Sequence, residues 1–450
     1  MFRIAGRAAS WPRSSHRLPA SSSSLLLQPF TTRGAGVPVI TPHPSDFDHH
    51  ALRVARLNHG SFGACPKPVL EIQNEYRNIW LEQPDALYFS GKLHQGIRDA
   101  AIAAGTTLIP TNKILQPEHL CLTENATVAA CAIAKKWGDE LQTGDVIVVF
   151  DVAYQAMINV LKEYCVSRGA SLHVLHLPFL ATTEEEIIDA IRVQMIDLPQ
   201  KPKYAFLDHV SSQPAVCLPI QSLIEMIREH GQDTMEIAVD GAHSVGSVPN
   251  LDVIEMNCDY FFSNLHKWAF APSTSTILWS KHLPKTRHPI VSWSWGQGMS
   301  EESLFPGTRD FSSYLAVPAA IEYLNKWEND GMNSQEYCHY RVSEAADKLR
   351  FEWNTEYLEE DGQQNGAMED SLIATQAMVR LPDELIVNDV PGQVGKGVRD
   401  VLRKEYNIEA AIGNFGNDKG SFVRLSFGVY NHSKDIRRLS NAILEILEDQ

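Results

Sequence analysis

A single lysine stands in a long stretch without other formal charge. Residues 260–280 read YFFSNLHKWAFAPSTSTILWS, and Lys267 is the one formally charged side chain among them. The alternation of apolar and turn-forming residues indicates a strand, a turn and a second strand. Removing a lysine from water favours the neutral amine, which lowers its pKa and makes the nitrogen a nucleophile able to form a Schiff base. Lys267 is therefore a candidate catalytic residue, the alternative being a turn lysine whose amine reaches solvent.

A carboxylate ends an earlier strand pattern. In MEIAVDGAHSVG, residues 235–246, an apolar run ends at Asp240 and small residues follow. Open α/β sheets bind ligands at the carboxyl ends of their strands, where such an aspartate projects. A pyridine ring that acts as an electron sink needs a carboxylate at its nitrogen and a lysine at its aldehyde carbon. Asp240 alone would also suit a helix cap, but Asp240 and Lys267 together favour pyridine-aldehyde chemistry.

The segments around these two residues, VDGAHSVG and DYFFSNLHKW, resemble the class V aminotransferase family of enzymes that use pyridoxal 5′-phosphate (PLP). The resemblance runs with gaps from about Leu57 to the C-terminus, through LNHGSFGACP, QPDALYF, ENATVAA, GTRDFSSYLAVPAA and VRLSFGVYN. It points to the branch that holds isopenicillin N epimerase, hercynylcysteine sulfoxide lyase and the plant-type L-cysteine desulfhydrases, and the chain most resembles the last of these. The resemblance implies PLP as cofactor.

Strand and helix patterns alternate through the middle of the chain. Apolar strand patterns lie at 146–150, 172–177, 204–208 and 236–239, and helix patterns follow the first three at 154–168, 184–195 and 220–230. Such alternation predicts an α/β fold whose mostly parallel sheet is covered by helices on both faces. The resemblance implies the PLP-dependent transferase fold type I. We expect an N-terminal segment at 46–80, a large PLP-binding domain at 81–320 and a smaller C-terminal α+β domain at 321–450.

A phosphate site is expected where a strand over His119–Thr123 meets a helix that begins at Ala126. The free N–H groups and positive dipole end of that helix suit a phosphate, and the Thr127 hydroxyl adds a donor. Asn125 as an ordinary helix cap explains the sequence equally well. In the family this first strand-to-helix turn binds the cofactor phosphate, so the resemblance assigns Asn125, Ala126 and Thr127 to it.

Arg424 lies in the middle of a strand pattern, among apolar neighbours. A buried guanidinium needs an anion, and its planar fork suits a carboxylate. An internal ion pair is the alternative. The segment VRLSFGVYN resembles the family segment whose arginine binds the substrate α-carboxylate, which favours Arg424 as a substrate-binding residue.

The resemblance also implies roles for residues that composition alone would place in ordinary loops and helix starts. Tyr154 would stack on the pyridine face and act as an acid. His243 would donate to the ring's phenolic oxygen, and His266 with Asn264 would bind the phosphate. Asn58 and His59 would contact the substrate at the mouth of the site. Thr308, in GTRD, would reach the phosphate of the other subunit, which implies a homodimer with shared active sites.

The expected reaction begins with an amino acid held by Arg424. Lys267 would take the Cα proton, and the electrons would move toward the ring nitrogen held by Asp240. Loss of thiolate from Cβ of L-cysteine then releases sulfide and gives aminoacrylate, which water hydrolyses to pyruvate and ammonia. Cysteine desulfurases need a mobile cysteine shortly before the arginine, whereas residues 411–421, AIGNFGNDKGS, have none. A carbon–sulfur lyase of the L-cysteine desulfhydrase type is therefore predicted.

Several alternatives stay open at this stage. A hercynylcysteine sulfoxide lyase or related cysteine-conjugate lyase, an epimerase of the isopenicillin N type and an aminotransferase all share the first step. A PLP-binding protein without turnover is the non-enzyme alternative. A nucleotide-binding module would need GxGxxG or GxxxxGK[ST], and neither occurs.

Composition limits the partners. The net charge of −16 argues against nucleic acid or an anionic membrane, and no stretch of about 18 apolar residues occurs. The seven cysteines are widely spaced without CxxC, which indicates reduced thiols and no metal site.

The first 45 residues contain five arginines and a serine run but no acidic residue, as organellar transit peptides do. We expect a mitochondrial location, and the plastid or the cytoplasm is the alternative. For the first 45 residues themselves, a disordered tail is the alternative to a transit peptide.

Overall fold

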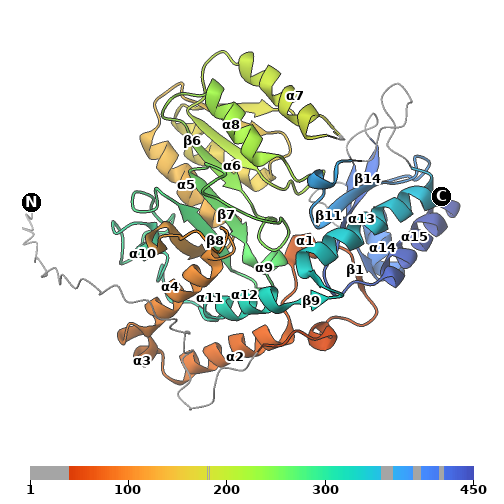
Figure 1. Cartoon of the computed structure of the whole chain (residues 1–450), viewed down its shortest axis with the longest axis horizontal. Helices are drawn as coiled ribbons and strands as arrows, with labels where there is room; N and C mark the ends of the chain where they lie inside the picture. Colours follow the sequence, from red (N-terminus) through yellow and green to blue (C-terminus); the bar gives the residue numbers. More distant parts are fainter. Residues whose placement is uncertain (1–39, 180, 182, 356–367, 389–396, 415–419) are drawn as a thin grey trace, which may run out of the picture. The chain divides into compact units, whose positions relative to one another are not determined.

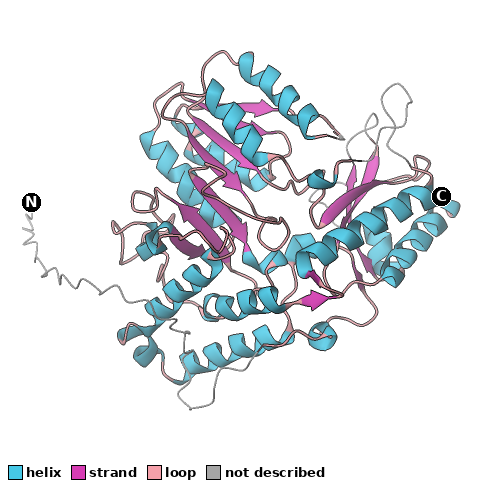
Figure 2. Ribbon diagram, viewed as in Figure 1, coloured by secondary structure: helices cyan, strands magenta, loops and turns pink. Residues whose placement is uncertain are grey.

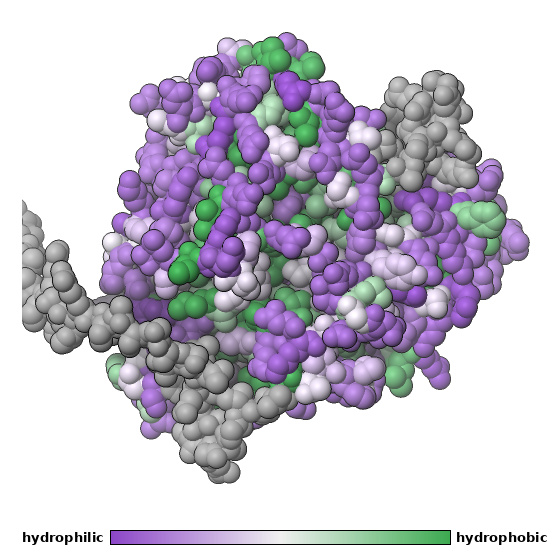
Figure 3. Space-filling view, viewed as in Figure 1, coloured by the Kyte–Doolittle hydropathy of each residue, from purple (hydrophilic) through white to green (hydrophobic). Residues whose placement is uncertain are grey.

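The computed structural model describes residues 40–179, 181, 183–355, 368–388, 397–414 and 420–450. Most of the expected leader at 1–45, most of an acidic segment at 356–370 and part of the segment 411–421 lie outside the described residues. No described helix is long and apolar enough to cross a membrane. The face of the molecule in Figure 3 is mostly hydrophilic, with smaller hydrophobic patches.

A seven-stranded sheet forms the centre of the described chain (Figure 1). Its spatial order is β2 (Leu120–Thr123), β8 (Thr276–Ser280), β7 (Tyr260–Asn264), β6 (Glu236–Asp240), β5 (Tyr204–Asp208), β3 (Val146–Phe150) and β4 (Ser171–Leu175). β4, β3, β5, β6 and β7 are parallel, and β8 runs antiparallel between β7 and β2. This confirms the prediction of a mostly parallel sheet.

Two hydrophobic clusters cover the two faces of this sheet. Strand residues alternate between the faces, so Ile147 and Val149 pack with α5 (Ala126–Glu140) and α6 (Gln155–Tyr164). Val146 and Val148 instead belong to the cluster of α4 (Lys92–Gly105), α7 (Glu184–Ile196), α8 (Ile220–His230) and α12 (Val317–Lys326). The helix predicted for 154–168 ends at Tyr164, and a 3-10 turn, Val166–Arg168, follows before Gly169 at φ 101°.

The remaining elements of this part are short or lie at its edge. They are α1 (His59–Phe62), α2 (Lys67–Glu82), α3 (Pro84–Phe89), α9 (Leu265–Trp268), α10 (Met299–Glu302), α11 (Ser312–Leu315), β9 (Glu328–Asn329) and β10 (Met332–Asn333). In α2, residues Ile72, Tyr76, Ile79 and Trp80 pack against the same cluster as α4 and α12. Their helical spacing therefore reflects core packing.

A second, three-stranded sheet follows toward the C-terminus (Figure 2). It consists of β11 (Gln376–Arg380), β14 (Ser421–Ser426) and β13 (Ala411–Asn414), all antiparallel. α13 (Ser334–Trp353), α14 (Val398–Glu405) and α15 (Ser433–Glu448) share its hydrophobic cluster, as do Ala55 and Leu57. β1 (Ala55–Arg56) pairs with β12 (Ile408–Glu409). The predicted boundary at 320/321 falls inside α12, and the proposed domain limits remain predictions.

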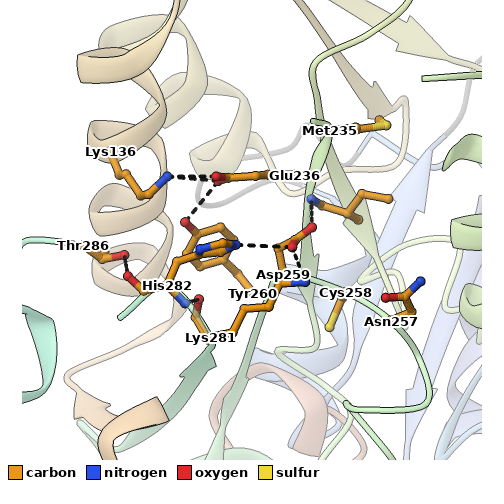
Figure 4. A network of polar contacts seen from close by, with 12 residues as sticks. Lys136, Met235, Glu236, Asn257, Cys258, Asp259, Tyr260, Lys281, His282 and Thr286 are labelled. Atoms are coloured by element: carbon orange, nitrogen blue, oxygen red, sulfur yellow. Dashed lines mark hydrogen bonds and ion pairs between the residues drawn. The ribbon is translucent and has the colours of Figure 1, made fainter. Parts of the chain in front are cut away.

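A network of hydrogen bonds and ion pairs joins the amino ends of β6 and β7 to neighbouring segments (Figure 4). Glu236 accepts hydrogen bonds from Lys136, from Trp137 Nε1 and from the Tyr260 hydroxyl. Asp259 accepts from the Ile237 N–H at 2.8 Å and pairs with Arg228 and Lys281, each at 2.7 Å. Burial alone would raise the pKa of Asp259, but the hydrogen bonds from His282, Lys281, Ile237 and Arg228 outweigh it and lower the pKa.

Replacing Asp259 with asparagine is expected to lower the free energy of unfolding by about 2 kcal/mol, because the change removes the charge of a buried carboxylate that pairs with the partly exposed Arg228 and Lys281. Because the folded-state pKa is depressed, this stabilisation is present above the unfolded pKa of about 3.9 and is lost as the pH falls through the folded value. Urea unfolding at several pH values measures both effects. Glu255→Gln, at a carboxylate that is 63% exposed, is the control and should shift stability by less than about 0.5 kcal/mol. Equal stability of Asp259→Asn and the wild type at neutral pH would contradict the assignment.

Candidate active site

A cavity of about 280 Å³ opens at the carboxyl ends of β5, β6 and β7, beside the N-terminus of α5. This is the edge of the sheet at which open α/β folds bind ligands. It collects most of the side chains that the sequence singled out: Asn125, Ala126, Thr127, Tyr154, Asp240, His243, Asn264, His266, Lys267 and Arg424. Asp208, Ser61, Phe62, Met157 and Ser212 also line it and were not predicted.

Lys267 lies on the single-turn helix α9. Two glycines allow other segments of the chain to approach this helix closely. Gly63 has φ +68°, and a Cβ there would lie 1.8 Å from the His266 carbonyl oxygen. Gly246 has φ +79°, and a Cβ there would lie 2.4 Å from the Trp268 carbonyl oxygen. Only glycine fits both the left-handed conformation and the space. Two other segments of the chain therefore pack closely against the backbone around Lys267.

The Lys267 amine lies 2.9 Å from His243 Nε2. Burial, opposed by the charge of Asp240 and reinforced by that of Arg424, lowers the pKa of Lys267 to about 7. Burial, with the nearby Lys267, also lowers the pKa of His243 well below its usual value, so this imidazole is neutral. In its protonated form the Lys267 amine can only donate, so Nε2 accepts and Nδ1 carries a proton for which no acceptor exists among the described residues. An unused buried donor in the cavity fits a ligand oxygen.

Asp240 is 5% exposed at the carboxyl end of β6. Its Oδ1 accepts the Ala242 N–H at 2.9 Å. Burial raises the pKa of Asp240, while the Ala242 hydrogen bond and the charge of Lys267 lower it again. These two partners favour the ionised form, which a ring nitrogen with a proton requires.

The N-terminus of α5 has one backbone donor left for a ligand. Asn125 Oδ1 caps the helix at the Val128 N–H, and Asn264 Oδ1 accepts the Ala126 N–H, each at 3.1 Å. We find no acceptor for the Thr127 N–H within the described chain. His266 Nδ1 lies 3.0 Å from the Ser275 carbonyl oxygen, which fixes the ring and leaves Nε2 as the second nitrogen. Asn264 therefore acts on the start of the helix, and Thr127 is the anion-binding donor that remains.

Arg424 is a buried cation whose partners are all neutral. Nη1 donates to the backbone and side-chain oxygens of Ser212, both at 2.9 Å. Nη2 donates to Asn58 Oδ1 at 2.7 Å and to Ser61 Oγ at 2.8 Å. Nε has no partner in the described structure, and no ion pair to Arg424 is seen there. Burial and the nearby Arg399 lower the pKa of Arg424 to about 10, so it stays charged at neutral pH. A buried guanidinium without an anion is suited to a substrate carboxylate.

Three predicted residues do not line the cavity. Asn58 lies behind Arg424 as an acceptor. His59 is 2% exposed, between the Lys267 carbonyl oxygen (2.8 Å) and the Tyr430 hydroxyl (3.0 Å). Thr308 is exposed. Asn58 and His59 thus support the functional side chains from behind, and the expected direct substrate contacts of both residues remain predictions. Tyr154, 57% exposed, lines the cavity at the start of α6.

The protein-family description "Aminotransferase class-V" matches residues 113–439 of this sequence. The chain belongs to the class V aminotransferase family. A protein from Arabidopsis thaliana named L-cysteine desulfhydrase is 32% identical to this class V chain over 446 residues, which cover 94% of each. The isopenicillin N epimerase of Amycolatopsis lactamdurans is 25% identical and covers 87% of this chain and 95% of its own length.

Solved structures share the fold of this class V chain. The cystine C–S lyase C-DES, in a complex with cysteine persulfide, matches with a TM-score of 0.65 and 18% identity, over 88% of this chain and 98% of its own. The cysteine desulfurase CsdA of Escherichia coli matches with a TM-score of 0.65 and 17% identity, over 91% of this chain and 99% of its own. These likenesses confirm the expected fold type I architecture, with a mostly parallel sheet and a small C-terminal sheet.

Proposed function

We propose that this class V enzyme is a PLP-dependent carbon–sulfur lyase that converts L-cysteine to sulfide, pyruvate and ammonia. The proposal rests on the cavity that joins the buried amine of Lys267, the carboxylate of Asp240 and the guanidinium of Arg424, which has neutral partners but no anion among the described residues. Relatives named L-cysteine desulfhydrase, 32% identical over 94% of the chain, support the substrate.

The residues present fit PLP as the cofactor. The Thr127 N–H and hydroxyl suit its phosphate, and the His243 Nδ1 proton without an acceptor suits its phenolic oxygen. His266, whose Nδ1 faces the Ser275 carbonyl oxygen, adds a donor from Nε2 only in its protonated form. Asp240 suits the protonated ring nitrogen, and Lys267 the aldehyde carbon. When bound, PLP supplies an electron sink for the electrons that remain when a proton leaves the substrate Cα.

The chain's own residues then divide the work. Arg424 binds the α-carboxylate, which orients the Cα–H bond toward the Lys267 amine. Lys267 takes the Cα proton, and its lowered pKa lets the amine be neutral near pH 7. His243, hydrogen-bonded to that amine, holds it in place. The thiolate leaves Cβ as sulfide, since no cysteine follows Cys338 in the sequence to receive the sulfur.

Purified PLP-loaded protein incubated with L-cysteine tests the reaction. Sulfide and pyruvate in equal amounts are the expected products. Formation of D-cysteine without sulfide would show an epimerase. Formation of alanine or a keto acid without sulfide would show other chemistry at the same site. Turnover of cysteine sulfoxides in preference to L-cysteine would keep the assignment as a lyase but change the proposed substrate. Absence of sulfide with all of these substrates would refute the proposal.

The rate at which apoprotein captures PLP should depend on pH through Lys267. The neutral amine is the nucleophile, so below a pKa of about 7 the capture rate should rise with pH, and above it the rate should level off. Stopped-flow absorbance measures the rate. Free Nα-acetyl-lysine is the control, because its unshifted amine, with a pKa of about 10.4, should still react faster with each pH step above 8. A protein rate that follows the control would contradict a lowered pKa.

We propose a homodimer in which Thr308 completes the partner's site. The exposure of Thr308 and its place outside its own cavity support this arrangement. Mixed subunits test it, because in a hybrid of Lys267→Ala and Thr308→Arg chains one site keeps both native residues. Random 1:1 mixing of two inactive variants should then restore about a quarter of wild-type activity in a two-site dimer. No recovery on mixing, or an active monomer on gel filtration, would refute shared sites.

We propose further that residues 1–45 direct the chain to an organelle, the mitochondrion first and the plastid second. Their arginine-rich, acid-free composition supports import. An Arabidopsis thaliana relative, 32% identical over 430 residues, is named chloroplastic, which supports the plastid. A fluorescent protein fused behind residues 1–45 should co-localise with a mitochondrial dye. Diffuse cytoplasmic fluorescence would contradict import.

A further inference from the structure

Asp208 and Asp240 are neighbours across the central sheet. Asp208 is the last residue of β5, and its Cα partner in the parallel ladder is Asp240, the last residue of β6. Neighbouring strands lie about 4.8 Å apart, and residues paired across them project to the same face. Both side chains line the active-site cavity, at 4% and 5% exposure. Two buried carboxyl groups therefore share one small region.

The two carboxyl groups have unequal support for a negative charge. Asp240 accepts the Ala242 N–H at 2.9 Å and is attracted by Lys267. No N–H or O–H group in the described part of the chain donates to Asp208 Oδ2. Burial raises the pKa of Asp208 well above its usual value, and the charges of Asp240 and Asp151 add to the shift, while a hydrogen bond from the backbone of Asp208 itself opposes it. Like charges this close in a buried site do not both ionise. The single negative charge belongs on Asp240 and the proton on Asp208.

We propose that Asp208 is a neutral carboxylic acid that donates a hydrogen bond to the Asp240 carboxylate and so positions it. The proton on Asp208 is a property of the protein alone, whereas its benefit to PLP binding rests on the proposed function. The donor stabilises the ionised form of Asp240, and it fixes the oxygen that faces the ring nitrogen. Asp208 is thus a positioning residue that acts through Asp240.

The first test uses apoprotein and requires no turnover. In this account the folded chain keeps a proton on Asp208 that the unfolded chain, with an aspartate pKa of about 3.9, releases. Folded Asp208 then binds more protons than unfolded, so wild-type stability falls as the pH rises from about 4 toward the raised pKa. Asp208→Asn has no such proton, so its stability lacks this decrease with rising pH.

Urea unfolding of wild type and Asp208→Asn from pH 5 to 8 measures the difference. The expected result is that the variant gains stability relative to wild type with each step up in pH. Asp233→Asn, at an exposed carboxyl group in the loop between α8 and β6, is the control and should run parallel to wild type. A difference between Asp208→Asn and wild type that is constant, or that reverses sign with rising pH, would overturn the proton assignment.

The second test compares a donor with a nondonor of similar size. Asparagine keeps an N–H donor, so Asp208→Asn should bind PLP within about threefold of wild type by fluorescence titration. Leucine has none, so Asp208→Leu should weaken PLP binding roughly 10- to 100-fold, as expected for losing a hydrogen bond to a charged acceptor. Equal affinities of the two variants would overturn the positioning role. Failure of sulfide release in wild type would refute the proposed reaction and leave both of these measurements valid.

Discussion

Replacing Lys267 with alanine is expected to reduce kcat for sulfide release by at least about 10²- to 10⁴-fold, the usual contribution of one positioned acid–base group. In the proposed mechanism, the variant loses both the amine that holds the cofactor and the base that takes the Cα proton. No other lysine lines the cavity, within the described residues, to replace it. Initial rates of sulfide and pyruvate formation, with PLP in excess, measure the loss.

Two further variants decide whether the amine itself is required. Lys267→Arg keeps a positive charge, but its guanidinium stays protonated, so it should be as inactive as the alanine variant. Lys162→Ala, at an exposed lysine on α6, should keep wild-type activity. Activity of Lys267→Ala within tenfold of wild type would show that another group performs the proton transfer.

Replacing Arg424 with glutamine is expected to lower kcat/KM for L-cysteine about 30- to 1,000-fold, which corresponds to about 2 to 4 kcal/mol. Its fork has only neutral partners, Asn58, Ser61 and Ser212, so the substrate carboxylate would be its first anion. Arg424→Lys should fall between wild type and glutamine, because an ammonium keeps the charge without the planar fork.

A substrate analogue without the carboxylate separates binding from general damage. Cysteamine has the amine and thiol of cysteine but nothing for Arg424 to bind. It should inhibit wild type and Arg424→Gln with similar constants, and PLP affinity should change little. Arg192→Gln, at a surface residue of α7 that is 45% exposed, is the control and should behave as wild type. An unchanged kcat/KM for L-cysteine in Arg424→Gln would exclude the carboxylate role.

Local sequence was sufficient to predict the parts of the site whose residues follow a strand directly. Asp240 ends an apolar run, and Lys267 follows another, so strand patterns alone place both at one edge of a parallel sheet. Asn125 precedes a helix pattern and does cap α5. The signal for Asp208 was of the same kind, because YAFLD ends on it as EIAVD ends on Asp240, and it was missed.

Contacts between distant segments could not be predicted in this way. Asn58 meets Arg424, and His59 meets the backbone of Lys267, across hundreds of intervening residues. The local sequence of LNHGSFG predicts a loop but not that Gly63 allows close contact with His266. Ser212 lies in a segment without any marked pattern, and only the folded chain brings its oxygens to Arg424. The roles of these residues depend on tertiary packing.

The central claim is that the Lys267 amine is covalently joined to PLP in the resting enzyme. Borohydride reduction of PLP-loaded protein, followed by digestion and peptide mass spectrometry, tests it most directly. We expect a phosphopyridoxyl group on the peptide that contains Lys267 and on no other lysine peptide. A fully covered digest in which the Lys267 peptide keeps its unmodified mass, or in which the label lies on another lysine, would contradict it.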